Sequence, residues 1–390
     1  MSDYVEVTSR GIGGRGKDSI GGAIFGFILA AVVVFALFWN EGRSVKRYKD
    51  LKEGAGAVVS VQSETVDPAM EGKLIHITGE TKTKAPLQDA DFGIQSSAIK
   101  LIRKAEMFQW VEDVKTEEKT KVGGTTETVK TYSYSQEWKD GLVDSSKFKK
   151  AAGHQNPTEM KYDSSSSMAD DVTVGAFSLP GFLVSKISVA GALAVETLEK
   201  ASDEIRKTGK LNNGTVYFGS NPASPAVGDQ RVSFQIVPNG PVSVVAQQHG
   251  NTFVSFHTSI GGQLDLLESG LMSAPEMFQL AQNRNNMLTL AIRVGGFVML
   301  GIAFSMILRP IAVLASILPF LGRLVGTGTT IIAFLLAAIV WTLTVAVAWI
   351  FYRPILGIAI LVVTAVLIAM VVKRFRKADG PALAGPPSLT

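Results

Sequence analysis

Hydrophobic and polar positions are unevenly distributed along this 390-residue chain, with apolar blocks near its two ends and charged residues between them. The larger block runs from Leu288 to Val372, and no Asp or Glu occurs between Glu276 and Asp379. A soluble domain covers its surface with charges of both signs. A helix in lipid needs none, because it satisfies its own backbone hydrogen bonds. The block therefore predicts membrane helices.

About 20 apolar residues are needed to cross the hydrocarbon core of a bilayer. This length predicts four transmembrane helices, over residues 19–39, 288–308, 328–351 and 355–372. Arg309-Pro310 is expected to close the second helix, and Arg353-Pro354 forms the turn before the fourth. Residues 309–327 are apolar but interrupted by Pro319, Gly322 and Arg323, which predicts an interfacial or re-entrant segment.

Four spans place both termini on one side of the membrane, and the distribution of basic residues indicates which side. Residues 1–18 predict a flexible Gly-rich arm with three basic residues, and residues 373–390 a basic, then Pro-rich, tail. By the positive-inside rule both are expected in the cytosol. The basic residues just after the first helix argue the other way. Residues 40–282 are then expected to be periplasmic or lumenal.

The hydrophilic region 40–282 predicts one α+β domain that is rich in strands and contains a helical insert. Alternating or β-branched segments predict strands over 73–78, 99–114, 126–139, 215–218, 231–237, 242–248 and 252–256. Residues 183–206 have helical spacing of Ile187, Leu193, Val195 and Leu198, which predicts the helical insert. Asn212-Asn213-Gly214 is expected to end it.

The segment before the second span predicts a further helix. Ser273 and Glu276 have the spacing of a capping box, with Pro275 tolerated in the first turn. A helix that starts there would run directly into the second span. It could lie on the membrane surface, brace the outer domain or form part of its core.

Candidate chemistry is sparse, so we expect neither an enzyme nor a cofactor or metal site. The chain has no cysteine, which excludes disulfides, thiolate catalysis and Cys-ligated metals. Its four histidines have no metal-binding spacing, and no G-x-S-x-G nucleophile motif occurs. The net charge of +4 is modest and forms no basic stripe interleaved with aromatics, so no nucleic-acid partner is expected.

A few residues in the apolar helices are candidates for specific contacts. Gly22 and Gly26 form a small-xxx-small pair that permits close helix contact. Arg293 lies near the start of the second span, where it could snorkel to the outer interface or meet a lipid phosphate. Arg353, in the short outer turn, is a second candidate for contact with a lipid headgroup.

Several motifs in the same order resemble the transmembrane protein 43 (LUMA) family, and the resemblance covers nearly the whole chain from the first span onward. They include Asn40-Glu41-Gly42-Arg43, Met107 to Glu112 around Trp110, Gly153-His154-Gln-Asn-Pro157, Val227 to Phe234 with Asp229 and Arg231, and Phe351 to Pro354. The resemblance implies four spans around a large lumenal domain and no known catalytic residues, so these motif residues have no assigned role.

The resemblance also implies location and partners. Animal members reside in the endoplasmic reticulum and inner nuclear membrane, self-associate and help to organise nuclear-envelope protein complexes. The cysteine-free composition leads us to expect a bacterial member in the inner membrane, with the lipid bilayer, other copies of itself and membrane proteins as partners.

Three functions remain open from the sequence. The first is a multi-pass scaffold that organises membrane protein complexes or membrane domains through its outer domain and homo-oligomerisation. The second is an oligomeric ion channel or transporter, although the apolar block holds no acidic residue of the kind that coupled transport requires. The third is an ectoenzyme, which would need an acid–base pair that the sequence does not reveal.

Overall fold

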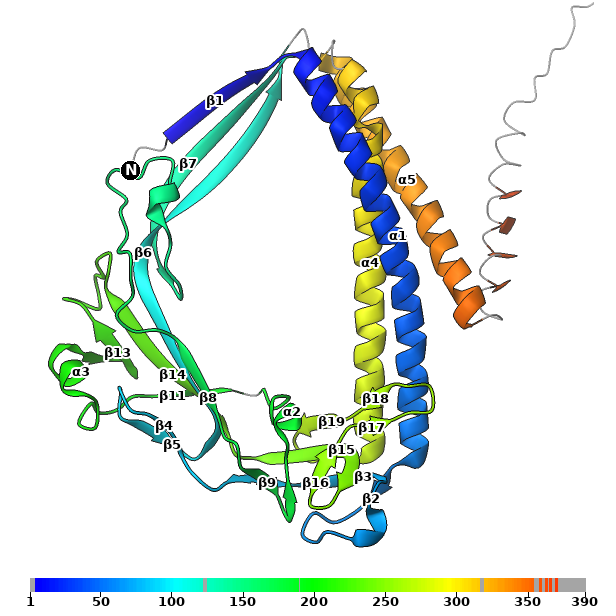
Figure 1. Ribbon diagram of the computed structural model, residues 1–390. Helices are drawn as coiled ribbons and strands as arrows, with labels where there is room; N and C mark the ends of the chain where they lie inside the picture. The colour runs from blue at the N-terminus through cyan, green and yellow to red at the C-terminus, as the bar shows by residue number, and fades with distance from the viewer. Residues whose placement is uncertain are drawn as a thin grey trace, which may run out of the picture. The chain divides into compact units, whose positions relative to one another are not determined.

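The computed structural model describes residues 4–121, 125–188, 190–315 and 319–353, with a few positions between 358 and 370 (Figure 1). It divides into two compact units. The β-rich unit comprises residues 1–9, 49–119 and 127–283, and the helical unit comprises residues 10–48, 120–126 and 284–390. Mixed helix and sheet with a β-rich domain is the class that the sequence predicts.

The larger sheet of the β-rich unit has eight strands and is built around a long hairpin of β6 and β7. Its order is β1 (Tyr4–Arg10), β7 (Thr126–Lys139), β6 (Ala98–Thr120), β14 (Gln230–Pro238), β13 (Thr215–Phe218) and β12 (Lys210–Asn212). Two further strands join it, β11 (Gly191–Leu193) on β14 and β8 (Ser165–Met168) on β6. The tight turn between β12 and β13 uses Asn213 and Gly214, both at positive φ, as a two-residue hairpin loop requires.

The second sheet has seven strands centred on β3 and β15. Its order is β10 (Phe177–Ser178), β9 (Val172–Val174), β3 (Leu74–Thr83), β15 (Pro241–His249) and β16 (Thr252–Val254), with β19 (Leu266–Ser269) on β15 and β2 (Val59–Ser60) on β3. Two separate hairpins pair β4 (Leu87–Asp89) with β5 (Ile94–Ser96) and β17 (Phe256–His257) with β18 (Gln263–Leu264).

Short helices connect these strands. They are the 3₁₀ turns η1 (Pro68–Met70) and η2 (Ser145–Lys147) and the helices α2 (Gly181–Val184) and α3 (Asp203–Thr208). Apolar side chains of both sheets form the cores. Ile75, Ile77 and Val244 are fully buried in one cluster, and Val216 and Val232 in another. Each segment predicted as a strand contains a strand in the structure. In β3, β14 and β15 the apolar residues lie on a buried face, as alternation predicts.

The predicted helical insert over residues 183–206 is wrong. The structure has β11 and two short helices there instead, which account for only part of the segment. The apolar residues with helical spacing are buried at separate sites: Ile187 packs in the core of the second sheet and Val195 in that of the first. Leu193 pairs with Phe234 across β11 and β14. Tertiary contacts therefore override the local spacing.

The N-terminal residues also differ from the expected flexible arm. Tyr4–Arg10 form strand β1, in which Tyr4 packs edge-on against the ring of Tyr132 at 5.8 Å. The carboxylate of Glu6 accepts a hydrogen bond from the hydroxyl of Tyr132 and forms an ion pair with Lys149. Helix α1 (Ile12–Ala57) then begins before the predicted span and continues beyond it. At 1.5 Å per residue, this helix is more than twice as long as the hydrocarbon core is thick.

Within the described residues, three helices are long and apolar enough to cross a membrane, with the candidate spans Gly16–Ala57, Ala274–Ala315 and Thr327–Tyr352. They lie in α1, α4 (Ala274–Ala315) and α5 (Pro319–Tyr352). The fourth predicted span, 355–372, falls largely outside the described residues, as does the tail. Helix α4 does not end at Arg309-Pro310 as expected, because it accommodates Pro310 and continues to Ala315. Apolar surroundings and neighbouring helices allow proline inside membrane helices.

Helix α4 starts as the capping box predicts. The Glu276 carboxylate accepts hydrogen bonds from both the backbone and the hydroxyl of Ser273, at 2.7 Å each. Met277 and Phe278 are buried in the β-rich unit against Leu74 and Val245 of its second sheet. Of the alternatives that the sequence left open, the first turns of this helix therefore form part of the core of the β-rich unit, and the helix runs on without a break.

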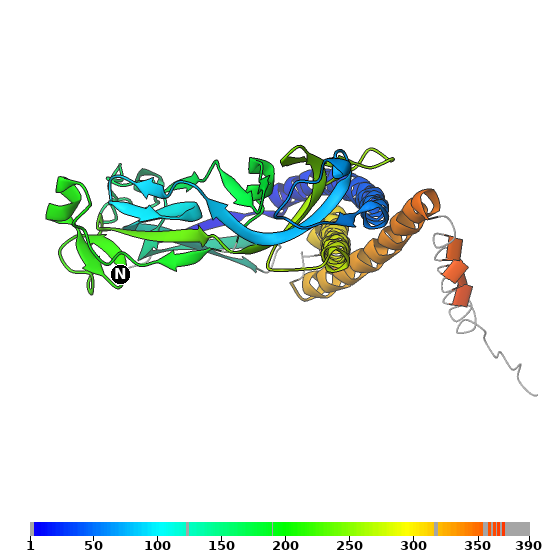
Figure 2. The same cartoon turned by 90° about the horizontal axis from the view of Figure 1, so that it is seen from below.

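The helical unit is held together where glycines let backbones approach closely. A side chain at Gly26 of α1 would meet the carbonyl oxygen of Ala303 in α4 at 2.7 Å. A side chain at Gly296 of α4 would meet Leu37 of α1 at 2.6 Å. Leu37, Leu300 and Ala337 are buried between α1, α4 and α5. In both cartoon views α1 and α4 run side by side (Figures 1 and 2).

Candidate functional site

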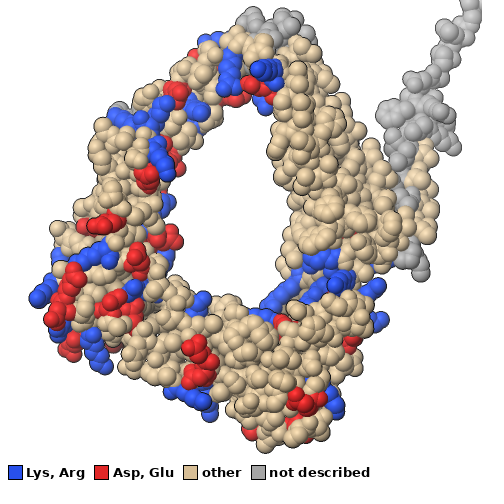
Figure 3. Space-filling view, in the orientation of Figure 1, with Lys and Arg blue, Asp and Glu red and all other residues tan. Residues whose placement is uncertain are grey.

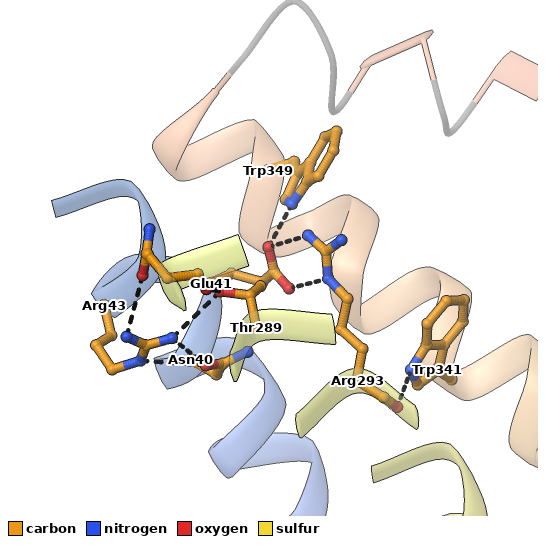
Figure 4. Close-up of polar contacts among 8 residues, drawn as sticks. Asn40, Glu41, Arg43, Thr289, Arg293, Trp341 and Trp349 are labelled. Carbon is orange, nitrogen blue, oxygen red and sulfur yellow. Dashed lines mark hydrogen bonds and ion pairs between the residues drawn. The ribbon is translucent and has the colours of Figure 1, made fainter. Parts of the chain in front are cut away.

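Polar side chains gather at one level of the helical unit, between α1, α4 and α5 (Figure 4). We call this group the polar cluster and define it as the labelled residues Asn40, Glu41, Arg43, Thr289, Arg293, Trp341 and Trp349, together with Asn285, which is bonded to Arg43. Polar and charged groups are costly in apolar surroundings unless they bond to one another. Their contacts therefore decide what this part of the molecule can do.

Glu41 is the carboxylate of the polar cluster, and only 1% of the residue is exposed. Arg293 binds both of its oxygens, with Nε at 2.6 Å and Nη2 at 2.7 Å. The indole Nε1 of Trp349 donates a third hydrogen bond at 2.6 Å. Trp341 donates to the backbone carbonyl of Arg293 at 2.9 Å. One buried ion pair thus ties the three helices together.

Arg43 occupies the other side of the polar cluster, where neutral side chains hold it. Its guanidinium donates to Oδ1 of Asn40 at 3.1 and 3.2 Å, to Oδ1 of Asn285 at 3.2 Å and to Oγ1 of Thr289 at 3.2 Å. Asn285 in turn donates to the carbonyl of Ser44 at 3.0 Å. The amide nitrogen of Asn40 is buried and has no hydrogen-bond acceptor in the described part of the chain.

Helical spacing brings these residues together. Asn285, Thr289 and Arg293 are four residues apart and so lie on one face of α4, while Asn40, Glu41 and Ser44 lie on the facing side of α1. Sequence reasoning singled out Arg293 but did not find its partner, because Glu41 is 252 residues away along the chain. The sequence did contain a signal for this pairing. Polar residues recur every four positions, at 285, 289 and 293, near the outer end of the second span, and the Asn40–Arg43 motif is near the outer end of the first.

The remaining predicted residues of the helices lie as follows. Gly26 is a contact between α1 and α4, whereas a side chain at Gly22 would meet only Met306, at 4.0 Å. Gly42 lies against the ring of Tyr352 in α5. Arg353 does not join the ion pair, and its guanidinium lies near the rings of Tyr48 and Trp349. Whether these residues contact lipid or a second copy stays a prediction.

Two predicted residues of the β-rich unit, Trp110 and His154, touch each other. The imidazole stacks on Tyr134 with ring centres 4.0 Å apart and meets the ring of Trp110 edge-on at 4.7 Å. Asn156, which the sequence did not single out, accepts from the backbone nitrogen of Trp110 at 2.7 Å and donates to its carbonyl at 2.9 Å. These contacts fasten the 141–157 loop to strand β6, which is a structural role.

Pro157, Asp229 and Arg231 lie around the start of β14. A side chain at Gly228 would meet Pro157 at 3.3 Å. Asp229 accepts a hydrogen bond from the Tyr217 hydroxyl, and burial together with this carboxylate raises the pKa of Tyr217. Arg231 faces Glu106 across β14 and β6 and binds it at 2.8 Å. Burial acts to raise the pKa of Glu106, but hydrogen bonds from Arg231 and Lys104 outweigh it and lower the pKa.

Neither group of residues forms a recognisable catalytic arrangement. Among the residues that the structure describes, no three or more His, Cys, Asp or Glu side chains are placed to hold a metal ion. Both oxygens of the buried Glu41 carboxylate are bonded to side chains of α4 and α5, which suits a clamp between helices.

Comparison with known proteins places the chain in a family. The family model described as Transmembrane protein 43 matches residues 107–354. The chain belongs to the transmembrane protein 43 family. It is 34% identical to Transmembrane protein 43 of Mus musculus over 388 residues, covering 96% of this chain and 95% of the mouse protein. It is 34% identical to the Homo sapiens protein (93% and 92% covered). It is 32% identical to the homolog of Drosophila melanogaster (87% and 91% covered).

No solved structure matches the chain. The family assignment confirms the resemblance found in the sequence motifs, and with the three candidate spans it identifies a membrane protein. Within the matched range, residues 107–354, lie both Arg293 of the polar cluster and the loop that contains His154.

Proposed function

We propose that this family member is a non-enzymatic, multi-pass membrane scaffold. Its β-rich unit would organise membrane protein complexes or membrane domains through partner binding and self-association. The observation that carries the proposal is the buried Glu41 carboxylate, whose two oxygens are bonded to Arg293 and Trp349 of two other helices. A helical anchor locked by a buried ion pair suits a protein that holds a large domain in place.

The contacts of the helices favour this proposal over the channel alternative. Gly26 and Gly296 pack within one copy of the chain, so they are not free to form the contacts of an oligomeric pore. The hydroxyls of Thr342 and Thr344 donate to carbonyls of their own helix, at 2.8 and 2.7 Å. These hydrogen bonds use the only donor of each hydroxyl, so neither side chain has a donor left for an anion in a pore.

Self-association is tested with two differently tagged copies of the full chain expressed together. We expect that capture of one tag in mild detergent retains the other. Mixing separately expressed copies after extraction is the control for aggregation in the detergent. Failure to capture the second copy would contradict the self-association part of the scaffold proposal. Self-association together with ion conduction by liposomes that contain the purified protein would favour the oligomeric channel.

We further propose that the β-rich unit lies outside the cytosol, in the periplasm or in the lumen of an endomembrane. The four basic residues between 373 and 377 support this orientation by the positive-inside rule. The N-terminal residues no longer support it, because residues 4–9, which were expected in a cytosolic arm, belong to the β-rich unit as part of strand β1. Ser165, an exposed residue of β8, is a suitable position for a cysteine because the chain has none. The Ser165→Cys protein should react with a membrane-impermeant thiol reagent on intact cells or spheroplasts. Reaction only after lysis would reverse the orientation.

A further inference from the structure

The side chain of Arg353 has an unusual environment at the C-terminal end of α5. Its guanidinium carbon lies 5.4 Å from the ring centre of Tyr48 in α1 and 5.9 Å from that of Trp349 in α5. Two aromatic rings from two helices thus fix the position of one cation. We propose that Arg353, held by Tyr48 and Trp349, binds the phosphate of an anionic phospholipid headgroup.

The hydrogen-bond donors of Arg353 are available for such a ligand. Its backbone nitrogen donates to the carbonyl of Trp349 at 2.6 Å. Its side chain has no acceptor and no carboxylate partner in the part of the chain that the structure describes. A guanidinium presents five donors in a planar fork that matches the oxygens of a phosphate. The two rings lie near the guanidinium but accept no N–H···O hydrogen bond from it, so its donors remain available to a phosphate.

The charge balance around Arg353 favours an anion. Arg293 is neutralised by Glu41, with which it forms a two-bond ion pair. Arg43 is bonded only to neutral oxygens of Asn40, Asn285 and Thr289. The single carboxylate of the polar cluster therefore leaves both Arg43 and Arg353 without a bonded counter-charge. In a medium of low dielectric constant this excess of positive charge favours an anionic ligand.

The structure separates the two arginines that the sequence had treated alike. Both Arg293 and Arg353 were candidates for a lipid headgroup, and both guanidinium groups lie over Trp349, at 5.3 and 5.9 Å. Only Arg353 keeps its donors free of protein acceptors among the described residues. Arg293 is therefore the counter-charge of Glu41 within the protein, and Arg353 is the residue that binds the lipid phosphate.

The position of the site favours a lipid over a soluble anion. It lies at the end of apolar helices whose outer surface has many exposed aromatic and aliphatic side chains, among them Phe351 (72% exposed) and Trp39 (57% exposed). Such aromatic residues are typical of the membrane–water interface, the depth of lipid phosphates. Figure 3 shows Lys and Arg side chains gathered at one end of the uncharged helix surface. This inference does not depend on self-association.

The test uses the purified full chain in a neutral mild detergent, titrated with phosphatidylglycerol, with bound lipid counted by native mass spectrometry. We expect Arg353→Gln to lower the affinity about tenfold, as expected for the loss of a hydrogen-bonded charge pair. Arg353→Lys keeps the charge but loses the planar fork, so its affinity should be intermediate. Phosphatidylcholine, which has no net charge, should bind weakly to all forms.

Two controls keep the result specific. Arg309→Gln removes one positive charge from an exposed residue, 16 positions along α4 from Arg293, and should leave the binding unchanged. Tyr48→Phe keeps the ring and should bind normally, whereas Tyr48→Leu should weaken binding. Both Tyr48 variants retain Arg353 and its charge. Comparing their lipid binding therefore tests the proposal even if the Arg353→Gln protein fails to fold.

Three outcomes would overturn the proposal. The first is undiminished lipid binding by a folded Arg353→Gln protein, and the second is an equal loss in Arg309→Gln. The third is displacement of the lipid by millimolar inorganic phosphate, which would identify a site for a soluble anion.

Discussion

At the residue scale, the central feature is a carboxylate that is buried with its counter-charge. A buried ion pair adds little net stability, because desolvation offsets the attraction of the charges. Removing one partner, in contrast, strongly destabilises the protein, because the other charge is then left buried and unpaired. Glu41 (1% exposed) and Arg293 should therefore behave as a unit.

The first prediction concerns this unit. Glu41→Gln and Arg293→Gln should each destabilise the detergent-solubilised protein by about 3 kcal/mol, because each leaves the partner's charge uncompensated. The double variant should lose much less than the sum. Thermal or denaturant unfolding of the four proteins measures this coupling. Additive losses would show that the two side chains do not interact.

A second residue-scale prediction concerns His76 in the β-rich unit. Its Nδ1 lies 3.1 Å from the hydroxyl of Ser60 and its Nε2 2.9 Å from the carbonyl of Met272. Burial lowers the pKa of His76, although the hydrogen bond to Met272 opposes this effect. The native state therefore binds a proton less readily than the unfolded state. Stability is full above the unfolded pKa of about 6.5 and is lost as the pH falls below it.

Unfolding of the wild type and of His76→Gln between about pH 7.5 and 5.5 measures this effect. The wild type should become less stable towards the acid end, and the variant should lose much of this dependence. His257→Gln, at an exposed position, is the matched control and should keep the wild-type profile. Identical profiles for the wild type and His76→Gln would contradict the assignment.

At the element scale, alternation and capping predicted much of the fold. The strand predictions held best where a strand has a buried face, as β14 and β15 do, and the Ser273–Glu276 capping box located the start of α4. The predicted helix over 183–206 failed because its apolar residues are buried in two different cores. The extension of α1 to Ala57 was missed because the helix becomes polar after Trp39, and its last residues, 49–57, belong to the β-rich unit, where Leu51 is buried in the core. Long-range pairs such as Glu41 with Arg293 have no local signature.

The packing of α1 on α4 gives the element-scale prediction. Gly26→Ala should destabilise the helical unit by about 1–3 kcal/mol, the range for an overpacked site. The reason is that the added methyl group would meet the backbone oxygen of Ala303 at 2.7 Å. Gly21→Ala, where a side chain would meet nothing within 4 Å, is the matched control. It should be neutral or slightly stabilising, as alanine favours helix more than glycine does. Equal effects at both positions, read from thermal unfolding, would contradict this packing.

At the scale of the whole molecule, the account describes a membrane protein of the transmembrane protein 43 family. In its helices most of the buried polar side chains bond to one another, and its β-rich unit contains most of the charged residues. This division of roles leads us to the proposed scaffold function, since binding surfaces are then concentrated in the β-rich unit. The same division places the proposed lipid contact of Arg353 at the end of the apolar helices.

The most direct test of the scaffold proposal is the mass and the electron-microscopic image of the full chain purified in mild detergent. We predict an oligomer whose copies join through the β-rich unit, with lipid or detergent between the helices of different copies. A symmetric ring of helices around a central opening would contradict the account and establish the channel in its place.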